Sequence, residues 1–499
     1  MSDVSKLILG IDLGNATSCV AAYNAANESS EIIDFSGGYA KASVPTMLKL
    51  TPKTLEWTFG EDAAINIGDS DEVSISGLVS MLRNSSGVSV QDVYYPAEKL
   101  ISMFIKNLLE KVLYLNPNCE ILKIVISFDD YIGKRALIKL SEAMSNVGIN
   151  KEIFLYRSDS DCILTKTLYE KSLACGKVII LDYGSRELIG KIFDVSTVGE
   201  NYNANVDSLN WSEEIGTSAI ENDILNLITT YYCEETEQVK ESLSFETRSQ
   251  LKQFALQHKD LFFKKGILTK PSQLYYNFAY PPFRKTITSE VSEQMISKYK
   301  QNLSKFLNEL VDDNDISLVI CVGSGFEMFW AKDFVNERFK DINVICSKSP
   351  NYAQAEGAAI LCALQLGICE AKPVEINDSF KAVRDIGIFA ISDNEMKFLS
   401  LIEEGAHTLT ETKRQVVILA DSTENDAYID IYAKSIDYSP KVIERFLVPG
   451  LPIRPKGTMK LGVSLKFINR SELMITLEDD GFGEIFPKTD FIYSTIMKY

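Results

Sequence analysis

Two stretches of this chain share a pattern that narrows the folds open to it. The first, Ile11–Gly14, reads Ile-Asp-Leu-Gly, and the second, Leu181–Gly184, reads Leu-Asp-Tyr-Gly; each ends an apolar run. Each predicts a buried strand that enters a tight turn at an Asp-x-Gly sequence. An ordinary β-hairpin explains either stretch alone. Their recurrence, about 170 residues apart, favours a duplicated α/β unit with two facing turns that hold phosphate on backbone N–H groups.

The same stretches suggest a place for a metal ion and a flat ligand. Asp12 and Asp182 come at strand ends, where a carboxylate can hold a magnesium ion directly or through water. A third buried strand, from Ile316, ends in Gly323-Ser324-Gly325. Small residues there let the backbone approach a flat ligand closely.

Composition excludes several classes of protein. The 499 residues are 45% hydrophobic and 24% charged, which is typical of globular domains, and the length is enough for roughly three. No apolar run reaches the ~20 residues of a membrane span, and the N-terminus lacks the features of a signal peptide. We therefore expect a cytoplasmic protein without a membrane partner. A net charge of −18 disfavours direct, sequence-specific nucleic-acid binding.

Cysteine and histidine usage excludes further chemistry. The nine cysteines are scattered without a Cys-x-x-Cys pair, as expected for free thiols in a reducing compartment. The two histidines, His258 and His407, make a His-based metal site or a Ser-His-Asp triad an unlikely interpretation.

The remaining periodicity predicts two domains. A short strand is expected at Ile32–Phe35, a helix at Ala97–Leu115, and a mostly helical region at Ile215–Leu310. Helical periodicity ends near residue 370, and strict alternation at Leu461–Phe467 is typical of a half-buried strand. The sequence thus predicts an α/β domain over residues 1–370, a linker over 371–380, and an antiparallel β domain over 381–499.

Several segments, taken in order, resemble the DnaK-type heat-shock chaperones. They are Gly10–Ala21, Val44–Thr46, Phe59–Ala64, Leu181–Gly184, Val322–Gly325, Ser349–Ala359, Asp385–Ile388 and Pro449–Gly457. The first segment is the most specific, and the similarity extends over nearly the whole chain. The resemblance implies a two-lobed, actin-like ATPase domain followed by a β-sandwich domain that binds peptides.

The resemblance also implies a nucleotide site for ATP with magnesium. The implied nucleotide-binding residues are Asp12, Gly14, Asn15, Ala16, Asp182, Gly184, Ser185, Gly216, Lys259, Gly323, Ser324 and Gly325. Of these, Asp12 and Asp182 would hold the magnesium ion, through water. No catalytic residue is assigned, although both aspartates stand at motif positions.

The chain departs from the family pattern at several positions that the family uses for catalysis. Asn15 and Ala16 stand where the family has two threonines, and Val79 falls near the family's catalytic lysine. At the second turn Arg186 and Glu187 replace part of a Gly-Gly-Gly-Thr run. Because phosphoryl transfer depends on positioned charges and donors, these losses predict weak or absent ATP hydrolysis with nucleotide binding retained.

Other departures point to one branch of the family. The chain ends at Tyr499, about where the peptide-binding sandwich ends, so no helical lid is expected, and Glu370–Ser379 lacks the leucine-rich acidic linker. With Asn15 after the motif glycine, it resembles the short, lidless, ribosome-associated members. That resemblance implies unfolded or nascent polypeptides as clients, a J-domain cochaperone and the ribosome as partners.

Three alternatives stay open. An actin-like sugar kinase shares the paired turns but has no β-sandwich like residues 380–490. A scaffold with a dead nucleotide site would not bind ATP. An active, divergent chaperone would replace the missing lysine from elsewhere, for example with Arg83 or Lys99.

Overall fold

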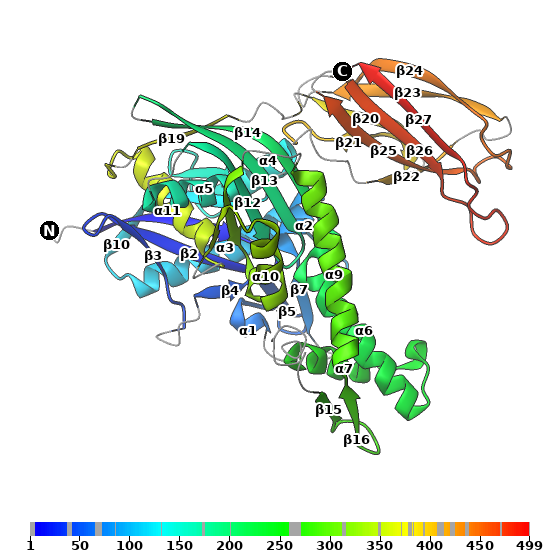
Figure 1. Cartoon of the computed structure of the whole chain (residues 1–499), viewed down its shortest axis with the longest axis horizontal. Helices are drawn as coiled ribbons and strands as arrows, with labels where there is room; N and C mark the ends of the chain where they lie inside the picture. The colour runs from blue at the N-terminus through cyan, green and yellow to red at the C-terminus, as the bar shows by residue number, and fades with distance from the viewer. Residues whose placement is uncertain are drawn as a thin grey trace. The chain divides into compact units, whose positions relative to one another are not determined.

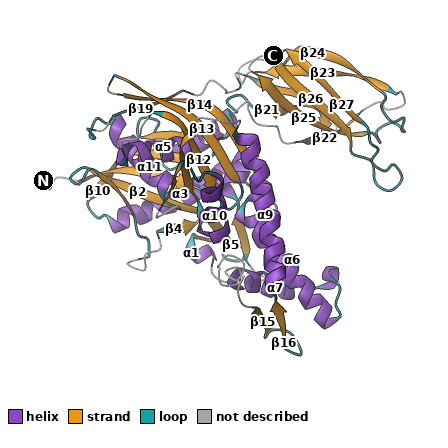
Figure 2. Ribbon diagram, in the orientation of Figure 1, coloured by secondary structure: helices purple, strands orange, loops and turns teal. Residues whose placement is uncertain are grey.

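The computed structural model divides the chain into two compact units (Figure 1). It describes residues 5–36, 42–64, 72–84, 86–130, 132–171, 175–199, 201–258, 271–311, 316–347, 351–370, 372–377, 382, 384–392, 395–406, 414–419, 425–434, 439–469 and 472–498. Unit one comprises Met1–Asp129 and Leu140–Asn377, and unit two comprises Asp130–Lys139 and Asp378–Tyr499. Unit one is mixed α/β with several sheets, and unit two is rich in β-structure (Figure 2).

Two larger sheets of unit one have the same topology. The first runs β11 (Phe154–Ser158), β10 (Cys119–Phe128), β1 (Ser5–Leu13), β2 (Thr17–Asn24) and β3 (Ser29–Ile32), with β4 (Ser43–Pro45) also pairing with β2. The second runs β18 (Asn343–Cys346), β17 (Ile316–Val322), β12 (Gly176–Tyr183), β13 (Leu188–Val198), β14 (Asn201–Ser212) and β19 (Val374–Asn377). In both, the central strand pairs parallel with one neighbour and antiparallel with the strand that follows it in sequence.

Three small sheets complete the β-structure of unit one. They are β6 (Glu56–Phe59) with β5 (Met47–Thr51) and β7 (Val73–Ser76), β8 (Gly87–Val90) with β9 (Val93–Pro96), and β15 (Ser272–Tyr276) with β16 (Phe283–Ile287). The last hairpin is an exception within Ile215–Leu310, where the expectation of a mostly helical region is otherwise confirmed. Tyr276 and Phe283 stack at 4.4 Å across it, and Tyr276 is fully buried, so tertiary packing overrides local periodicity.

Helices surround these sheets. They are α1 (Glu61–Ala64), α2 (Leu78–Arg83), α3 (Ala97–Leu115), α4 (Lys134–Asn146), α5 (Asp159–Glu170), α6 (Thr217–Thr236), α7 (Phe245–His258), α9 (Ser289–Leu310), α10 (Phe329–Arg338) and α11 (Ala353–Gln365), with short 3₁₀ turns η1 (Glu213–Ile215), η2 (Lys240–Ser242) and η4 (Ser324–Glu327). Helix α3 has the predicted bounds, because its apolar side chains recur at helical spacing and are buried.

Small residues allow helix α11 to pack closely on its neighbours. It packs against α5 and the first sheet. A Cβ atom on Gly357 would lie 1.9 Å from the carbonyl oxygen of Cys162 on α5. A Cβ atom on Gly10 of β1 would lie 2.1 Å from the carbonyl oxygen of Ala355 on α11. Backbones this close leave no room for side chains, so the Ala/Gly-rich sequence of α11 is a packing requirement.

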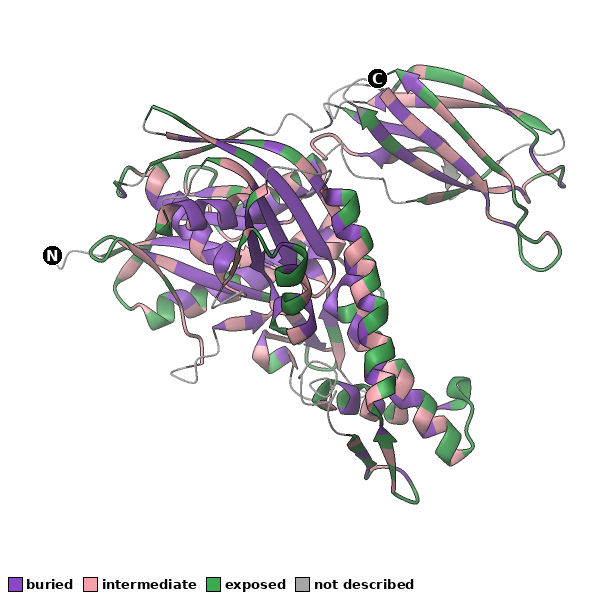
Figure 3. Cartoon of the chain, in the orientation of Figure 1, coloured by how far each residue is buried: buried purple, intermediate pink, exposed green. Residues whose placement is uncertain are grey.

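Unit two is built from two four-stranded antiparallel sheets. One runs β21 (Glu395–Ile402), β20 (Asp385–Ser392), β23 (Asp426–Lys434) and β24 (Lys441–Pro449), and the other runs β22 (Gln415–Ile418), β25 (Lys460–Asn469), β26 (Glu472–Asp479) and β27 (Ile492–Lys498). Strands of both sheets contribute to one apolar core. The alternation of buried and exposed residues along the strands is visible in Figure 3.

A buried ion pair holds the long loops of unit two. The guanidinium of Arg454 donates to both carboxylate oxygens of Asp479, at 2.9 and 2.6 Å. Asp479 also accepts from the backbone N–H groups of Gly481 and Thr489. Burial opposes ionisation, yet these hydrogen bonds keep the pKa of Asp479 below its usual value. The segment Pro449–Gly457, which contains Arg454, is thereby anchored on β26.

Two expectations about element position need correction. Strand β3 covers Ser29–Ile32, so the strand expected at Ile32–Phe35 begins and ends too late. Residues 374–377, inside the expected linker of residues 371–380, form strand β19, which pairs parallel with β14 from Tyr202 onward. Such pairing between distant segments leaves no local pattern in four residues.

Candidate functional site

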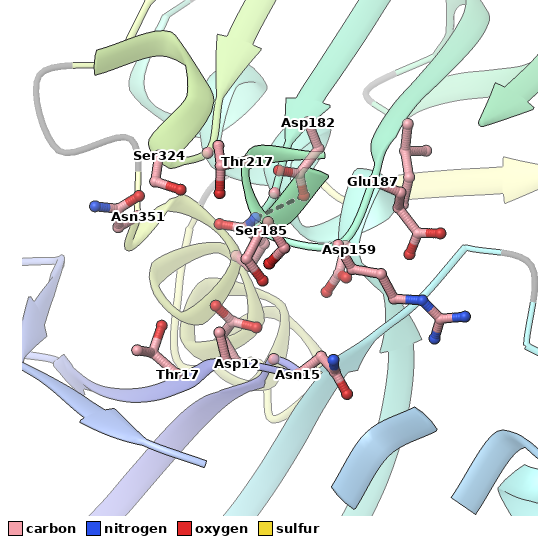
Figure 4. Close-up of a pocket in the computed structure, with 18 of the residues that line it drawn as sticks. Asp12, Asn15, Thr17, Asp159, Asp182, Ser185, Glu187, Thr217, Ser324 and Asn351 are labelled. Carbon is pink, nitrogen blue, oxygen red and sulfur yellow. Dashed lines mark hydrogen bonds between the residues drawn. The ribbon is translucent and has the colours of Figure 1, made fainter. Parts of the chain in front are cut away.

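The two Asp-x-Gly turns border one cavity of about 380 Å³ in unit one (Figure 4). Its walls come from the tips of the β1–β2 and β12–β13 hairpins, the start of α6, the turn after β17, and α11. The lining residues are Asp12, Gly14, Asn15, Ala16, Thr17, Ser43, Asp129, Asp159, Asp182, Gly184, Ser185, Arg186, Glu187, Ile189, Thr217, Ser218, Glu221, Gly323, Ser324, Asn351 and Gln354.

The two turns occupy equivalent positions in their sheets. Asp12 pairs with Cys19 on the antiparallel neighbour β2 and with Ser127 on the parallel neighbour β10. Asp182 pairs in the same way with Ile189 on β13 and with Val322 on β17. Each aspartate therefore comes at the end of a central strand, and Figure 4 shows the two entering the cavity from opposite sides.

The turn after β17 requires glycine at its first position. Gly323 has φ +90°, and a Cβ atom there would lie 2.5 Å from the carbonyl oxygen of Tyr183. This backbone therefore lies directly against the second turn and brings Gly323 and Ser324 to the cavity.

The cavity is strongly acidic. Its six carboxylate residues are Asp12, Asp129, Asp159, Asp182, Glu187 and Glu221. Arg186 is the one basic residue among the described residues that line it. Burial, and then the charge of Asp182, raise the pKa of Asp12 to about 8. In the absence of a cation, Asp12 therefore holds a proton at neutral pH.

Hydrogen bonds fix several of these carboxylates. Asp182 accepts from Nε2 of Gln354 at 2.8 Å, and Asp159 accepts from the hydroxyl of Ser127. Asp12 accepts a weaker bond from Sγ of Cys19 at 3.7 Å. Among the described residues, Oε1 of Gln354, which belongs to a residue that is 7% exposed, has no hydrogen-bond partner. A buried oxygen without a donor, beside carboxylates, is the kind of group that a hard cation or its water would satisfy.

A side-chain bridge links the two turns at one edge of the cavity. Oδ1 of Asn15 accepts from the hydroxyl of Ser80 at 2.8 Å and from its backbone N–H at 3.2 Å. Arg186 donates from Nη1 to Oγ of Ser80 at 2.7 Å, and from Nη2 to Glu213 at 2.5 Å. The first turn, helix α2 and the second turn are thus joined in series through Ser80.

The structure brings most of the expected nucleotide-site residues together. Asp12, Gly14, Asn15, Ala16, Asp182, Gly184, Ser185, Gly323 and Ser324 all line the cavity. Gly216 precedes the first residue of α6, and Gly325 packs on the ring of Tyr183; neither lines the cavity. Lys259 lies outside the described residues.

Other lining residues were not expected from the sequence. Asp129 follows β10 and Asp159 follows β11, and a polar residue directly after a buried parallel strand was a usable signal for both. Glu221 and Gln354 lie within helices, where nothing local distinguishes them from ordinary surface residues.

Val79, near the position of the family's lysine, and the two candidate replacements, Arg83 and Lys99, have different surroundings. Val79 is 1% exposed, packed in the core on α2. Arg83 pairs with the cavity residue Asp129 at 3.7 Å and with Glu213 at 3.6 Å. Lys99 lies over the ring of Tyr95 at 5.3 Å and does not line the cavity.

Two further features of the described residues concern membranes and metals. Across the residues that the structure describes, no helix is both long and apolar enough to cross a bilayer. Within the same residues, no three His, Cys, Asp or Glu side chains are placed to hold a metal ion by themselves. A cation at Asp12 and Asp182 would therefore depend on water or on a ligand for its remaining coordination.

Comparison with protein families finds a match in each unit. Residues 381–499 match a domain of unknown function (DUF8552). Residues 30–339 match the family of unknown function (DUF5716) C-terminal, a match that includes the second Asp-x-Gly turn and begins after the first. Because this match covers more than half of the 499 residues, the chain belongs to the DUF5716 family.

Proposed function

We propose that this protein binds ATP together with magnesium in the unit-one cavity, and hydrolyses it slowly or not at all. The observation that carries the proposal is the pair of equivalent Asp-x-Gly turns, each ending a central strand and bordering one cavity. Paired turns at the ends of duplicated sheets are what an actin-like nucleotide cleft requires. The shared strand order of the two larger sheets supports that architecture.

The charge of the cavity supports a requirement for a divalent cation. A triphosphate brings several negative charges to a wall that already holds six carboxylate residues. Carboxylate and amide oxygens fit a hard cation, and Asp12, Asp182 and Oε1 of Gln354 supply them from two sides. Magnesium typically keeps several waters and is shared between one or two carboxylates and phosphate oxygens, which suits a site with few protein ligands. When bound, it would neutralise phosphate charge.

The groups available for catalysis support slow turnover. Val79 is buried where the resembled family has its lysine, and it offers no charge to the cavity. Oδ1 of Asn15 is engaged with Ser80, and the guanidinium of Arg186 is engaged with Ser80 and Glu213. Because phosphoryl transfer is accelerated by charged donors already aimed at the transferring group, a site whose lining guanidinium is committed elsewhere should bind better than it cleaves.

The second unit extends the proposal to an atypical chaperone or cochaperone. Its two antiparallel sheets have edge strands, β21 and β24 in one and β22 and β27 in the other. Strand edges offer unpaired N–H and C=O groups to extended polypeptide. We propose unfolded or nascent polypeptides as clients, a J-domain cochaperone and the ribosome as partners, and the cytoplasm as the compartment. Affinity capture of the full chain that recovers neither a J-domain protein nor ribosomes would contradict this part.

Nucleotide titration with turnover measured in the same sample tests the core of the proposal. We expect ATP binding with magnesium, and at least about tenfold weaker binding with EDTA, equivalent to about 1.4 kcal/mol. Asp182→Asn should lose most of the magnesium dependence. Asp194→Asn is the matched control, because Asp194 lies on β13 in the same sheet but is exposed outside the cavity.

Each outcome of this titration distinguishes a candidate function. No ATP binding under either condition would overturn the proposal in favour of a nucleotide-free scaffold. Binding with rapid turnover would overturn slow hydrolysis and favour an active, divergent chaperone. Transfer of phosphate to a sugar would favour the kinase alternative.

A further inference from the structure

Two cysteines lie side by side at the edge of the second sheet. Cys321 on β17 is the register partner of Cys346, the last residue of β18. Strand β18 is the edge strand of this sheet and has four residues. Just beyond the pair, the backbone N–H of Ser347 donates to the carbonyl oxygen of Cys321 at 3.1 Å, which keeps the two strands together at this point.

The two thiols lie on the same face of the sheet. Cys321 is fully buried in the apolar core beneath α9 and α10, and Cys346, half-buried, packs on the same core. The two side chains share a hydrogen bond. Neighbouring strands are ~4.8 Å apart, within the range of about 4.4 to 6.8 Å that disulfide-linked Cα atoms span. The end of a short edge strand can also adjust without disturbing the sheet interior.

The two thiols have different environments, and Cys321 donates the hydrogen bond that Cys346 accepts. The hydrogen bond from Cys321 lowers the pKa of Cys346 to about 7, against the effect of its own burial and with help from the charge of Lys332. Cys346 is therefore the more readily ionised of the two thiols, and the thiolate is the form that attacks oxidants. Burial instead raises the pKa of Cys19, Cys162 and Cys362, which makes those thiols unreactive.

We propose that Cys321 and Cys346 form a redox-active pair that closes reversibly to an intramolecular disulfide when a peroxide oxidises Cys346. The proposal rests on strand register, the shared face and the thiol–thiol contact. It is independent of the proposed nucleotide function. It adds a modification site at the strand whose next residues, Val322 and Gly323, lead to the cavity.

The reaction balances with hydrogen peroxide as the oxidant. The Cys346 thiolate attacks one peroxide oxygen, an S–O bond forms, the O–O bond breaks, and hydroxide leaves. The sulfur of Cys321 then attacks the sulfenic acid; the S–S bond forms, the S–O bond breaks, and water leaves with the proton of Cys321. Two thiols lose two electrons in total, and one peroxide becomes two waters once hydroxide takes up the proton lost by Cys346.

Thiol counting on the folded, full-length chain tests the pair. The protein is treated with about one equivalent of hydrogen peroxide, its remaining thiols are alkylated after denaturation, and digested peptides are identified by mass. We expect seven alkylated cysteines instead of nine, a 2 Da loss in the intact mass, and one peptide pair joined through Cys321 and Cys346. Dithiothreitol should restore all nine thiols.

Matched variants separate a specific pair from general oxidation. Cys321→Ser should stop cross-linking and leave a sulfenic acid on Cys346 that dimedone traps. Cys233→Ser, which alters a half-buried thiol on α6 outside the pair, should leave the cross-link unchanged. The proposal is overturned if both cysteines remain alkylatable after peroxide, or if Cys346 is oxidised to the sulfinic acid with no cross-link in the unaltered protein.

Discussion

The two Asp-x-Gly turns of unit one occupy equivalent places in sheets of the same order, yet their surroundings differ. The first turn is made of small residues, Gly14, Asn15 and Ala16, whereas the second carries Arg186 and Glu187 at its tip. Asp12 accepts a weak bond from Sγ of Cys19 and holds a proton, whereas Asp182 accepts a 2.8 Å bond from Gln354. The two turns therefore have equivalent backbone positions, but they give the cavity two chemically different walls.

The strands behind the turns differ as well. Two positions before the turn aspartate, β1 has Gly10 and β12 has Ile180, and Ile180 is fully buried. Helix α11 lies directly on β1 at Gly10, with no space for a Cβ atom. The asymmetry shows that the equivalent strands of the two halves are packed by different partners, so equivalent residues are not interchangeable.

The largest effect is expected from enlarging the residue at position 10 and shortening the one at position 180. Gly10→Val should destabilise unit one by about 3 kcal/mol or more, because its side chain would overlap backbone atoms of α11 that cannot move aside. Ile180→Ala should cost about 2 to 5 kcal/mol by opening a cavity instead. Urea unfolding followed by tryptophan fluorescence measures both, because Trp57, Trp211 and Trp330 all lie in unit one.

The matched control for Gly10→Val is Gly184→Ala. A Cβ atom on Gly184 would be 3.5 Å from the carbonyl oxygen of Glu187, which is an ordinary contact. We expect it to change stability by less than about 1 kcal/mol. Equal losses for the two glycine variants would show that close packing on α11 is not what distinguishes β1.

The next test uses the proton on Asp12. Because its pKa rises from 3.8 unfolded to about 8 folded, the folded chain binds more protons than the unfolded chain between these values. Stability of unit one should therefore fall as pH rises from about 4 to about 8, and the loss should be complete above pH 8. Asp12→Asn should remove this slope and be more stable than the unaltered protein at pH 8 to 9, by more than about 1 kcal/mol.

Two variants sharpen the pH experiment. Asp182→Asn should reduce the slope without removing it, since the Asp182 charge is the second cause of the shift after burial. Asp194→Asn, exposed on β13, should leave it unchanged. The profile of unfolding midpoint against pH is the readout, in buffers without divalent cations. If the unfolding midpoint of Asp12→Asn depended on pH as in the unaltered protein, another residue would have to bind the buried proton.

The smallest expected effect concerns the bridge between the turns. Ser80→Ala removes the hydroxyl that joins Asn15 to Arg186, and should cost about 1 kcal/mol of unit-one stability. A double-mutant cycle with Arg186→Gln should give a coupling of about 0.5 to 1.5 kcal/mol. Ser74→Ala, exposed on β7, should stay within about 0.5 kcal/mol. Additive losses for Ser80 and Arg186 would mean that the turns are stabilised separately.

Much of this organisation was predictable from sequence. The bounds of α3, the strands before both turns, and the alternating strand β25 follow from local periodicity, because burial of one face or of a whole strand leaves a repeating pattern. The Asp-x-Gly repeat, the Gly323–Gly325 turn and the family resemblance together pointed to nine of the residues that line the cavity. Hairpin β15–β16 and strand β19 were not predictable, since Tyr276 of the hairpin packs on the distant Phe254 of α7 and β19 pairs with the distant strand β14.

The sequence by itself determined the two turns, the mixed α/β character of the first unit and the β-rich second unit, because these depend on residues near one another in the chain. Only the tertiary structure decided which residues surround the turns. Asp129, Asp159 and Asp182 come from three separate segments, and their convergence on Asp12 makes the cavity acidic; burial, and then the charge of Asp182, raise the pKa of Asp12. The same holds for Cys321 and Cys346, whose proximity is set by the pairing of β17 with β18. Local chemistry selects the elements, whereas long-range packing sets the electrostatic environment on which their chemistry depends.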